Sequence, residues 1–263
     1  MSLISYENLP SFMKNKKVKK YYDILKKKKL YLSLKRIFDF YAGTALVVVF
    51  ALPMGVIAYK IKKSSKGHIL FVQDRITKYG KKFPIYKFRT MTEGAHKGSA
   101  LTVGQDSRIT EIGETLRKYR LDEIPQLFNI IGGDMSFVGT RPEVEKYVKH
   151  YTDEMKATLL MPAGLTSRAS IAYKDEARLL DGATDPDAVY INRVLPEKMK
   201  YNLEGIEKAR LYTFNTNNAS VNLYISIRRH CKGMKSRHHA PVDVFDRVID
   251  EDGQIRYALI GEQ

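Results

Sequence analysis

The longest apolar run of the chain extends from Phe40 to Tyr59 and reads FYAGTALVVVFALPMGVIAY, with no charged residue over 20 positions. A helix of about 20 apolar residues is long enough to cross the hydrocarbon core of a bilayer. Pro53 lies inside the run. Because proline lacks a backbone N–H and clashes with the preceding turn, it is expected to kink or break a helix there.

Basic residues flank both ends of this run, with Lys35 and Arg36 before it and four lysines after it. The positive-inside tendency therefore places both ends on the cytoplasmic side. We predict a re-entrant membrane helix over residues 35–62 that is broken at Pro53, enters one leaflet and returns. A helix that spans the bilayer and a helix buried in a soluble core are the alternatives.

After this run, short apolar segments alternate with turn signals. Residues 68–76 (HILFVQDRI) and 83–91 (FPIYKFRTM) are rich in β-prone residues and flank the turn KYGKK, so we predict two strands. Apolar periodicity and start and stop signals predict helices over 109–119, 143–160, 187–208 and 219–232. The helix over 219–232 ends in basic residues and is a candidate interfacial amphipathic helix, with a core helix as the alternative. Residues 241–263 are predicted to form a hairpin. The fold class expected is a small α/β (α+β) domain behind the membrane helix.

The distribution of charged residues divides the chain into segments. The net charge is +16, and residues 1–36 hold eleven basic residues against two acidic ones, whereas residues 243–263 hold six acidic residues against two arginines. We expect a basic arm at 1–34, the membrane helix at 35–62, a folded domain at 63–235 and an acidic tail at 236–263. A lysine-rich arm beside an apolar segment favours anionic membrane lipids over nucleic acid as its partner. An arm that only sets topology is the alternative. The single cysteine, Cys231, excludes a disulfide framework and a cysteine-rich metal site.

Two acidic residues stand together in the sequence RLDEIPQLFNIIGGDMSFVGTRPE, which contains Asp122, Glu123, Pro125 and Arg141. Proline is tolerated in the first turn of a helix and a glycine pair ends one, so Asp122 and Glu123 are placed at or just before a helix N-terminus. Such an end has free N–H donors and positive dipole, and it suits carboxylates and phosphate. An acidic cap without further function is the alternative.

Several motifs in this order resemble the bacterial sugar transferases, the monotopic phosphoglycosyl transferases that begin glycan assembly on a polyprenol carrier. The motifs are KRIFDF…ALPMG, FVQDRITKYGKKFPIYKFRTM, LRKYRLDEIPQLFNIIGGDMSFVGTRPE and AGLTS, and the resemblance extends from about Lys35 to about Lys232. It implies a catalytic domain at 63–235, bound through its re-entrant helix to the cytoplasmic face of the bacterial inner (plasma) membrane. It also implies that a phospho-sugar passes from a UDP-sugar to polyprenol phosphate, giving UMP and polyprenol-diphosphate-sugar, as the first membrane step of exopolysaccharide, capsule, O-antigen or glycoprotein glycan synthesis.

The resemblance also implies roles for residues. Asp122 matches the nucleophile of the family, which forms a covalent aspartyl phospho-sugar intermediate, and Glu123 matches its partner acid. Both acids would bind Mg²⁺, the cofactor expected. As hypotheses, the cationic side chains of the motifs would bind substrate phosphate oxygens; these are Lys87, Arg89, Arg117 and Arg141. A structural ion pair is the alternative for each of them.

Other readings stay open at this point. A diphosphate-sugar hydrolase would attack the same intermediate with water, and a non-catalytic membrane-tethered scaffold would need no special role for Asp122. Leu52 stands where the family often has serine before its proline, which bears on the geometry of the re-entrant helix. The sugar, the glycan pathway, the function of the acidic tail and any homo-oligomer are not given by the sequence.

Overall fold

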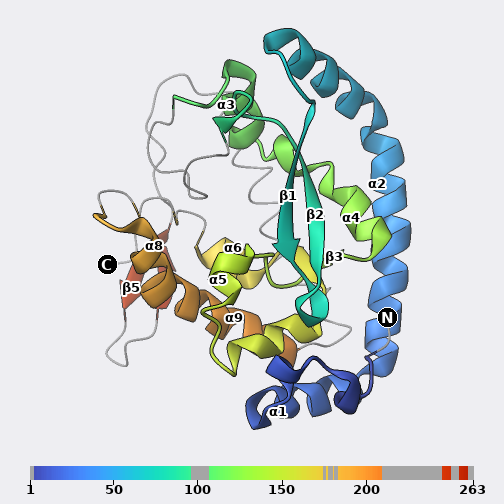
Figure 1. Cartoon of the computed structure of the whole chain (residues 1–263), viewed down its shortest axis with the longest axis vertical. Helices are drawn as coiled ribbons and strands as arrows, with labels where there is room; N and C mark the ends of the chain where they lie inside the picture. The colour runs from blue at the N-terminus through green and yellow to red at the C-terminus, as the bar shows by residue number, and fades with distance from the viewer. Residues whose placement is uncertain are drawn as a thin grey trace. The chain divides into compact units, whose positions relative to one another are not determined.

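Two units make up the chain, Met1–Ala219 and Ser220–Gln263. The structure is a computed structural model (Figure 1) that describes residues 3–95, 107–173, 176, 180, 183–208, 245–249 and 255–259. The elements of the first unit are η1 (Tyr6–Asn8), η2 (Ser11–Met13), α1 (Lys16–Lys26), α2 (Lys29–Ser64), β1 (Leu70–Ile76), η3 (Lys78–Gly80), β2 (Lys82–Phe88), α3 (Glu111–Lys118), η5 (Leu121–Glu123), α4 (Gln126–Gly132), β3 (Met135–Val138), α5 (Glu145–Val148), η6 (Met155–Leu160), β4 (Ala163–Thr166), α6 (Arg168–Ala172), α8 (Pro186–Val189), the π-helix η7 (Tyr190–Val194) and α9 (Leu195–Glu207). The expected mixture of helices and strands is confirmed.

The N-terminal residues, expected as a basic arm, are part of the hydrophobic core. Val18, Tyr21, Tyr22 and Leu25 follow the helical spacing i, i+3, i+4, i+7 and form the buried face of α1. They belong to one cluster with buried residues of η6 and α9. The Asn15 side chain starts α1 by accepting a hydrogen bond from Val18 N at 2.9 Å. The lysines of α1 point outward, so the segment keeps a basic surface while its apolar face is buried.

The apolar run forms one helix, α2, of 36 residues with Pro53 inside it. Of the kink or break expected at Pro53, there is no break, because α2 continues through the proline. Figure 1 shows the helix curving in its second half. The first half contacts α4 and β3, while Ile57 and Ile61 near the end are buried with Phe88 and Leu116. Packing at both ends holds the helix on one domain.

The predicted strand pair is confirmed as the antiparallel hairpin β1–β2, in which Gln73 pairs with Ile85. Tyr79 (φ 60°) and Gly80 (φ 75°) turn the chain between the strands. A second, parallel pair joins β3 and β4, with Met135 opposite Ala163. Buried residues of β2, α4, β3 and β4 form one hydrophobic cluster, against which side chains in the middle of α2 pack.

Two of the predicted helices have contrasting outcomes. The single helix expected over 143–160 is wrong: the chain forms the short α5 and the 3-10 helix η6 instead. The four consecutive residues 157–160 are all buried, which one face of an α-helix cannot achieve. The helix expected over 187–208 is confirmed as the run α8–η7–α9. It starts where the Asp185 side chain accepts from Ala188 N, with Pro186 in the first turn.

The second unit contains β5 (Phe245–Ile249) and β6 (Ile255–Leu259), which pair antiparallel with Arg247 opposite Tyr257. The hairpin predicted in the acidic tail is therefore confirmed. The helix predicted over 219–232, the candidate interfacial helix, lies outside the described residues.

Candidate active site

Asp122 and Glu123 lie in the 3-10 turn η5, four and three residues ahead of the first residue of α4. Arg120 (φ 55°) adopts the left-handed conformation between α3 and η5 and reverses the chain there. This conformation is uncommon outside glycine. Both acids are buried, with 8% and 9% of their surfaces exposed. Their predicted position just before a helix is confirmed.

The carboxylate of Glu123 is surrounded by cations. Its Oε1 lies 2.5 Å from Arg141 Nη2, 3.0 Å from Lys87 Nζ and 3.6 Å from Arg120 Nη1. Burial raises the pKa of Glu123, but the charges of Arg141 and Lys87 outweigh burial and lower the pKa well below its ordinary value. The Glu123 carboxylate is therefore held in its charged form by the neighbouring cations.

Asp122 has a different environment from its neighbour. Its Oδ1 is buried and has no hydrogen-bond partner in the described part of the chain. Burial, and next the negative charge of Glu123, raise the pKa of Asp122, while Lys87, Arg120 and Arg117 oppose the rise. The carboxylate of Asp122 is therefore more basic than that of Glu123, as a carboxylate nucleophile requires.

Arg141 is positioned by a close crossing of two backbone segments. Gly164 N donates to Thr140 O at 2.8 Å, and Gly139 N donates to Thr166 O at 3.0 Å. A Cβ atom on Gly164 would overlap with the backbone of Gly139. The two glycines therefore allow the sequences GTRPE and AGLT to cross in contact, which directs the residue after Thr140 toward Glu123.

The other predicted phosphate ligands separate into two groups. Lys87, on β2, contacts Glu123 directly, and burial lowers the pKa of its ammonium group. Arg117 projects from α3, donates from Nε to Thr90 Oγ1 at 2.9 Å, and is near enough to lower the pKa of Asp122. The structure thus brings Lys87, Arg117 and Arg141 around the two acids.

Arg89, in contrast to these three residues, contacts the end of α2. Its Nη1 donates to Lys66 O at 2.6 Å, and its Nη2 donates to Ser65 O and Ser65 Oγ at 2.9 Å. These contacts give the carbonyl groups after the helix a partner and join the end of α2 to the residue that follows β2. A phosphate contact by Arg89 stays a prediction, and it would require these bonds to be exchanged.

The start of α2 is attached to the same region by a motif whose function sequence reasoning missed. Arg36 donates from Nη1 to Ile130 O at 2.7 Å and from Nη2 to Ile131 O at 2.6 Å, near the end of α4. One turn later, Asp39 Oδ1 accepts from Phe137 N at 3.2 Å. Charged residues just before an apolar run were the signal available. Arg36 and Asp39 connect α2 to α4 and β3, the two elements that follow the acidic pair.

The carboxylates expected to hold Mg²⁺ are those of Asp122 and Glu123. Within the described ranges, no group of three or more His, Cys, Asp or Glu side chains could hold a metal ion. Mg²⁺ is commonly bound by one or two carboxylates together with substrate phosphates and waters. Adjacent Asp122 and Glu123, with one buried oxygen of Asp122 lacking a partner, fit such a site.

The model of the family described as "Bacterial sugar transferase" matches residues 30–203. The chain is 37% identical over 127 residues to a UDP-N-acetylgalactosamine-undecaprenyl-phosphate N-acetylgalactosaminephosphotransferase of Aeromonas hydrophila, covering 48% of this chain and 30% of that protein. It is 33% identical over 165 residues to a UDP-glucose:undecaprenyl-phosphate glucose-1-phosphate transferase of Klebsiella pneumoniae, covering 60% and 36%.

A third relative has a more similar length. The chain is 37% identical over 143 residues to an uncharacterized sugar transferase of Bacillus subtilis (strain 168), covering 52% of this chain and 68% of that protein. By contrast, the chain spans only about a third of the length of the Aeromonas and Klebsiella proteins. The family match covers well over half of the present chain and includes both acids and every motif around them. The chain belongs to the bacterial sugar transferase family.

Proposed function

We propose that this protein transfers a phospho-sugar from a UDP-sugar to a polyprenol phosphate at the membrane. The observation that carries the proposal is the contrast between the two adjacent carboxylates. Three cations lie around Glu123, whereas Asp122 has a raised pKa and a buried oxygen without a partner. The names of the Aeromonas and Klebsiella relatives, which specify transfer from UDP-sugars to undecaprenyl phosphate, support the same reaction.

In the proposed reaction, a carboxylate oxygen of Asp122 attacks the phosphorus atom that bears the sugar. A phosphorus–oxygen bond forms to Asp122, the bond to the bridging oxygen breaks, and UMP leaves with that electron pair. An oxygen of the polyprenol phosphate then attacks the same phosphorus and releases the Asp122 carboxylate. Division into two steps lets one small site use a water-soluble donor and a membrane-bound acceptor in turn.

The surrounding side chains of the chain provide charge and position. Lys87, Arg117 and Arg141 surround the acids, and arginine's planar fork suits phosphate oxygens. Asp122 and Glu123 would hold Mg²⁺, which neutralises charge on the diphosphate when bound. Because its anionic form is compensated by three cations, Glu123 stays charged beside Asp122 and keeps the nucleophile basic.

We further propose that the protein is monotopic and associates with the cytoplasmic face of the plasma membrane through α2. By length and composition, α2 is the one helix in the described ranges that is apolar enough to cross a membrane, and 11% of its apolar window is buried. Contacts at both ends of α2 with the same domain favour a helix held on one side of the bilayer. Its outward side chains form an apolar surface: Tyr41, Val48, Val49, Leu52, Val56 and Tyr59.

The test is to measure UMP release from a panel of UDP-sugars. Detergent-solubilised protein is assayed with Mg²⁺, in the presence and in the absence of polyprenol phosphate. We expect lipid-dependent release from at least one donor and its loss in Asp122→Asn. Release that needs no lipid would replace the transferase with a hydrolase. Undiminished release by Asp122→Asn would remove Asp122 as the nucleophile. Glu114→Gln, at an exposed carboxylate of α3, is the matched control.

A further inference from the structure

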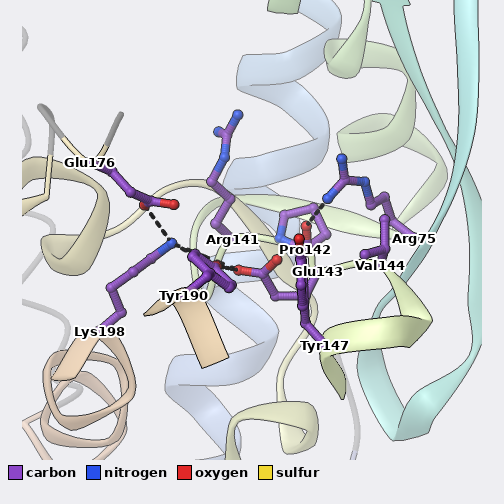
Figure 2. Close-up of a pocket in the computed structure, with 9 residues that line it drawn as sticks. All are labelled: Arg75, Arg141, Pro142, Glu143, Val144, Tyr147, Glu176, Tyr190 and Lys198. Atoms are coloured by element: carbon purple, nitrogen blue, oxygen red, sulfur yellow. Dashed lines mark hydrogen bonds and ion pairs between the residues drawn. The ribbon is translucent and has the colours of Figure 1, made fainter. Parts of the chain in front are cut away.

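A polar cavity of about 140 Å³ lies beside Arg141 (Figure 2). Arg75 from β1, Glu143, Glu176, Tyr190 from η7 and Lys198 from α9 contribute to its lining. Figure 2 shows Glu143 between Tyr190 and Lys198 on one side and Arg75 on the other. We propose that this cavity binds the sugar ring of the UDP-sugar donor. The proposal rests on the transferase function proposed above.

The lining presents donors and acceptors in fixed positions. Tyr190 Oη donates to Glu143 Oε1 at 2.5 Å, Lys198 Nζ donates to Tyr190 Oη at 3.0 Å, and Lys198 Nζ lies 2.8 Å from Glu176 Oε2. Glu143, Tyr190 and Lys198 are buried, with 7%, 2% and 5% of their surfaces exposed. Two carboxylates and an ammonium group therefore meet in one cavity, with their geometry set by mutual contacts.

A lining of this kind suits a polyhydroxyl ligand. A water molecule occupies about 30 Å³ in the liquid, so the cavity has room for several. Ligand groups displace ordered water without loss of affinity when they reproduce its hydrogen bonds. Each hydroxyl of a sugar ring both donates and accepts, and it can therefore satisfy carboxylate and ammonium groups together.

Other portions of the donor fit less well. A phosphate at Lys198 would meet the carboxylates of Glu143 and Glu176, which already lie 3.7 and 2.8 Å from its Nζ. The cavity is smaller than the roughly 300 Å³ at which pockets for drug-sized ligands begin, which disfavours a whole nucleoside. Tyr190 has no open face for a base, because its ring lies 4.7 Å from the ring of Tyr147 and 5.0 Å from Lys198 Nζ.

Arg141 connects the cavity to the reacting atoms. Its side chain lines the cavity, while its guanidinium lies 2.5 Å from Glu123, the residue next to Asp122. In a UDP-sugar, the sugar is bonded directly to the phosphate that Asp122 would attack. A site for the sugar must therefore adjoin the site for that phosphate, and this cavity does so through Arg141. Glu176 and Lys198 become the side chains that contact sugar hydroxyls and influence which sugar is accepted.

The test measures binding rather than turnover, so that it is independent of the lipid-dependent reaction. Full-length protein in detergent is titrated calorimetrically with UDP-glucose, UDP-galactose, UDP-N-acetylgalactosamine and UDP. The variants are Glu176→Gln and Lys198→Met, with Glu114→Gln on α3 and Lys200→Met on α9, both at exposed positions, as matched controls. Thermal melting verifies folding. If Lys198→Met does not fold, the comparison rests on Glu176→Gln, whose side chain is 26% exposed.

We expect the wild type to prefer one UDP-sugar over UDP, and each cavity variant to reduce that preference about tenfold, the effect of losing one hydrogen bond to a charged group. Affinity for UDP itself should stay unchanged. Three results would overturn the proposal: an unchanged preference in the variants, an equal loss of UDP binding, or a wild type without preference. Failure of the transferase proposal would show differently, as absence of lipid-dependent UMP release that requires Asp122.

Discussion

Arg141 Nη2 lies 2.5 Å from Glu123 Oε1, although 18 residues separate them in the chain. The contact depends on the crossing of Gly139 and Gly164, which brings the turn before Arg141 against β4. It neutralises much of the charge of Glu123 next to Asp122. Because two adjacent buried carboxylates repel each other, this ion pair, together with the contacts of Lys87 and Arg120 to Glu123, favours the charged forms of both acids in one site.

Loss of the Arg141 charge should impair activity more than folding. In Arg141→Met we expect kcat/KM for UMP release to fall about a hundredfold or more, because a charge aimed at the reacting phosphate is removed. The free energy of unfolding should fall by about 1–3 kcal/mol, less than for a fully buried pair since 32% of the side chain is exposed. Arg193→Met, at an exposed position of η7, should change neither. Retained activity in Arg141→Met would contradict the assigned function of this arginine.

The pH dependence should report the raised pKa of Asp122. A carboxylate with a raised pKa stays protonated to higher pH, so the acid limb of the kcat/KM profile should lie above the ordinary aspartate value of about 3.9. Glu123→Gln removes the neighbouring negative charge and should move the acid limb of the residual activity to lower pH. The measurement is a pH–rate profile for both proteins. A limb that does not move would show that Glu123 does not influence Asp122, and a limb that moves upward would show that its net influence is opposite in sign.

The crossing of the two glycines should be intolerant of a methyl group. Gly164→Ala places a Cβ in the backbone of Gly139, and we expect a loss of about 1–3 kcal/mol in the free energy of unfolding, as overpacking usually causes, together with reduced activity. Gly205→Ala is the control, because a Cβ there has nothing within 4 Å and lies in α9. It should stabilise the helix by up to about 1 kcal/mol. Equal behaviour of the two variants in denaturant titrations would contradict the described contact.

Membrane association should depend on the outer face of α2. Val48 and Leu52 are 71% and 79% exposed and lie one turn apart. Glutamate at both positions should leave the fold intact and weaken cosedimentation with anionic lipid vesicles at least tenfold, because charge is costly in hydrocarbon. Val72→Glu on β1, where valine is 52% exposed, is the control. Unaltered cosedimentation of the double variant would locate the membrane contact elsewhere.

The lysine-rich N-terminal residues should contribute to stability through their apolar face. Leu25 is fully buried in the main core cluster, and Leu25→Ala should lower the free energy of unfolding by about 2–5 kcal/mol. The adjacent Lys26→Ala, at an exposed position, should change it by no more than about 0.5 kcal/mol. Denaturant titration distinguishes the two. A small effect of Leu25→Ala would restore the interpretation of this segment as a separate arm.

Local signals in the sequence determined the elements that carry the candidate chemistry. Apolar, β-prone residues on both sides of a turn were enough for β1 and β2, and Asp185-Pro186 marked the start of the run that ends in α9. Proline after the acidic pair and glycine at the end of α4 located Asp122 and Glu123 just before a helix. Each of these signals operates over a few residues, where backbone sterics and capping are sufficient.

Tertiary structure decided what lies between distant segments. Only packing shows that α2 continues through Pro53, that α1 belongs to the core, and that Arg89 binds the end of α2 rather than the acidic pair. The bond from Tyr190 to Glu143 joins residues 47 positions apart. Such contacts depend on how several hydrophobic faces are buried together, and the free energy of that burial belongs to the assembled core rather than to any one segment.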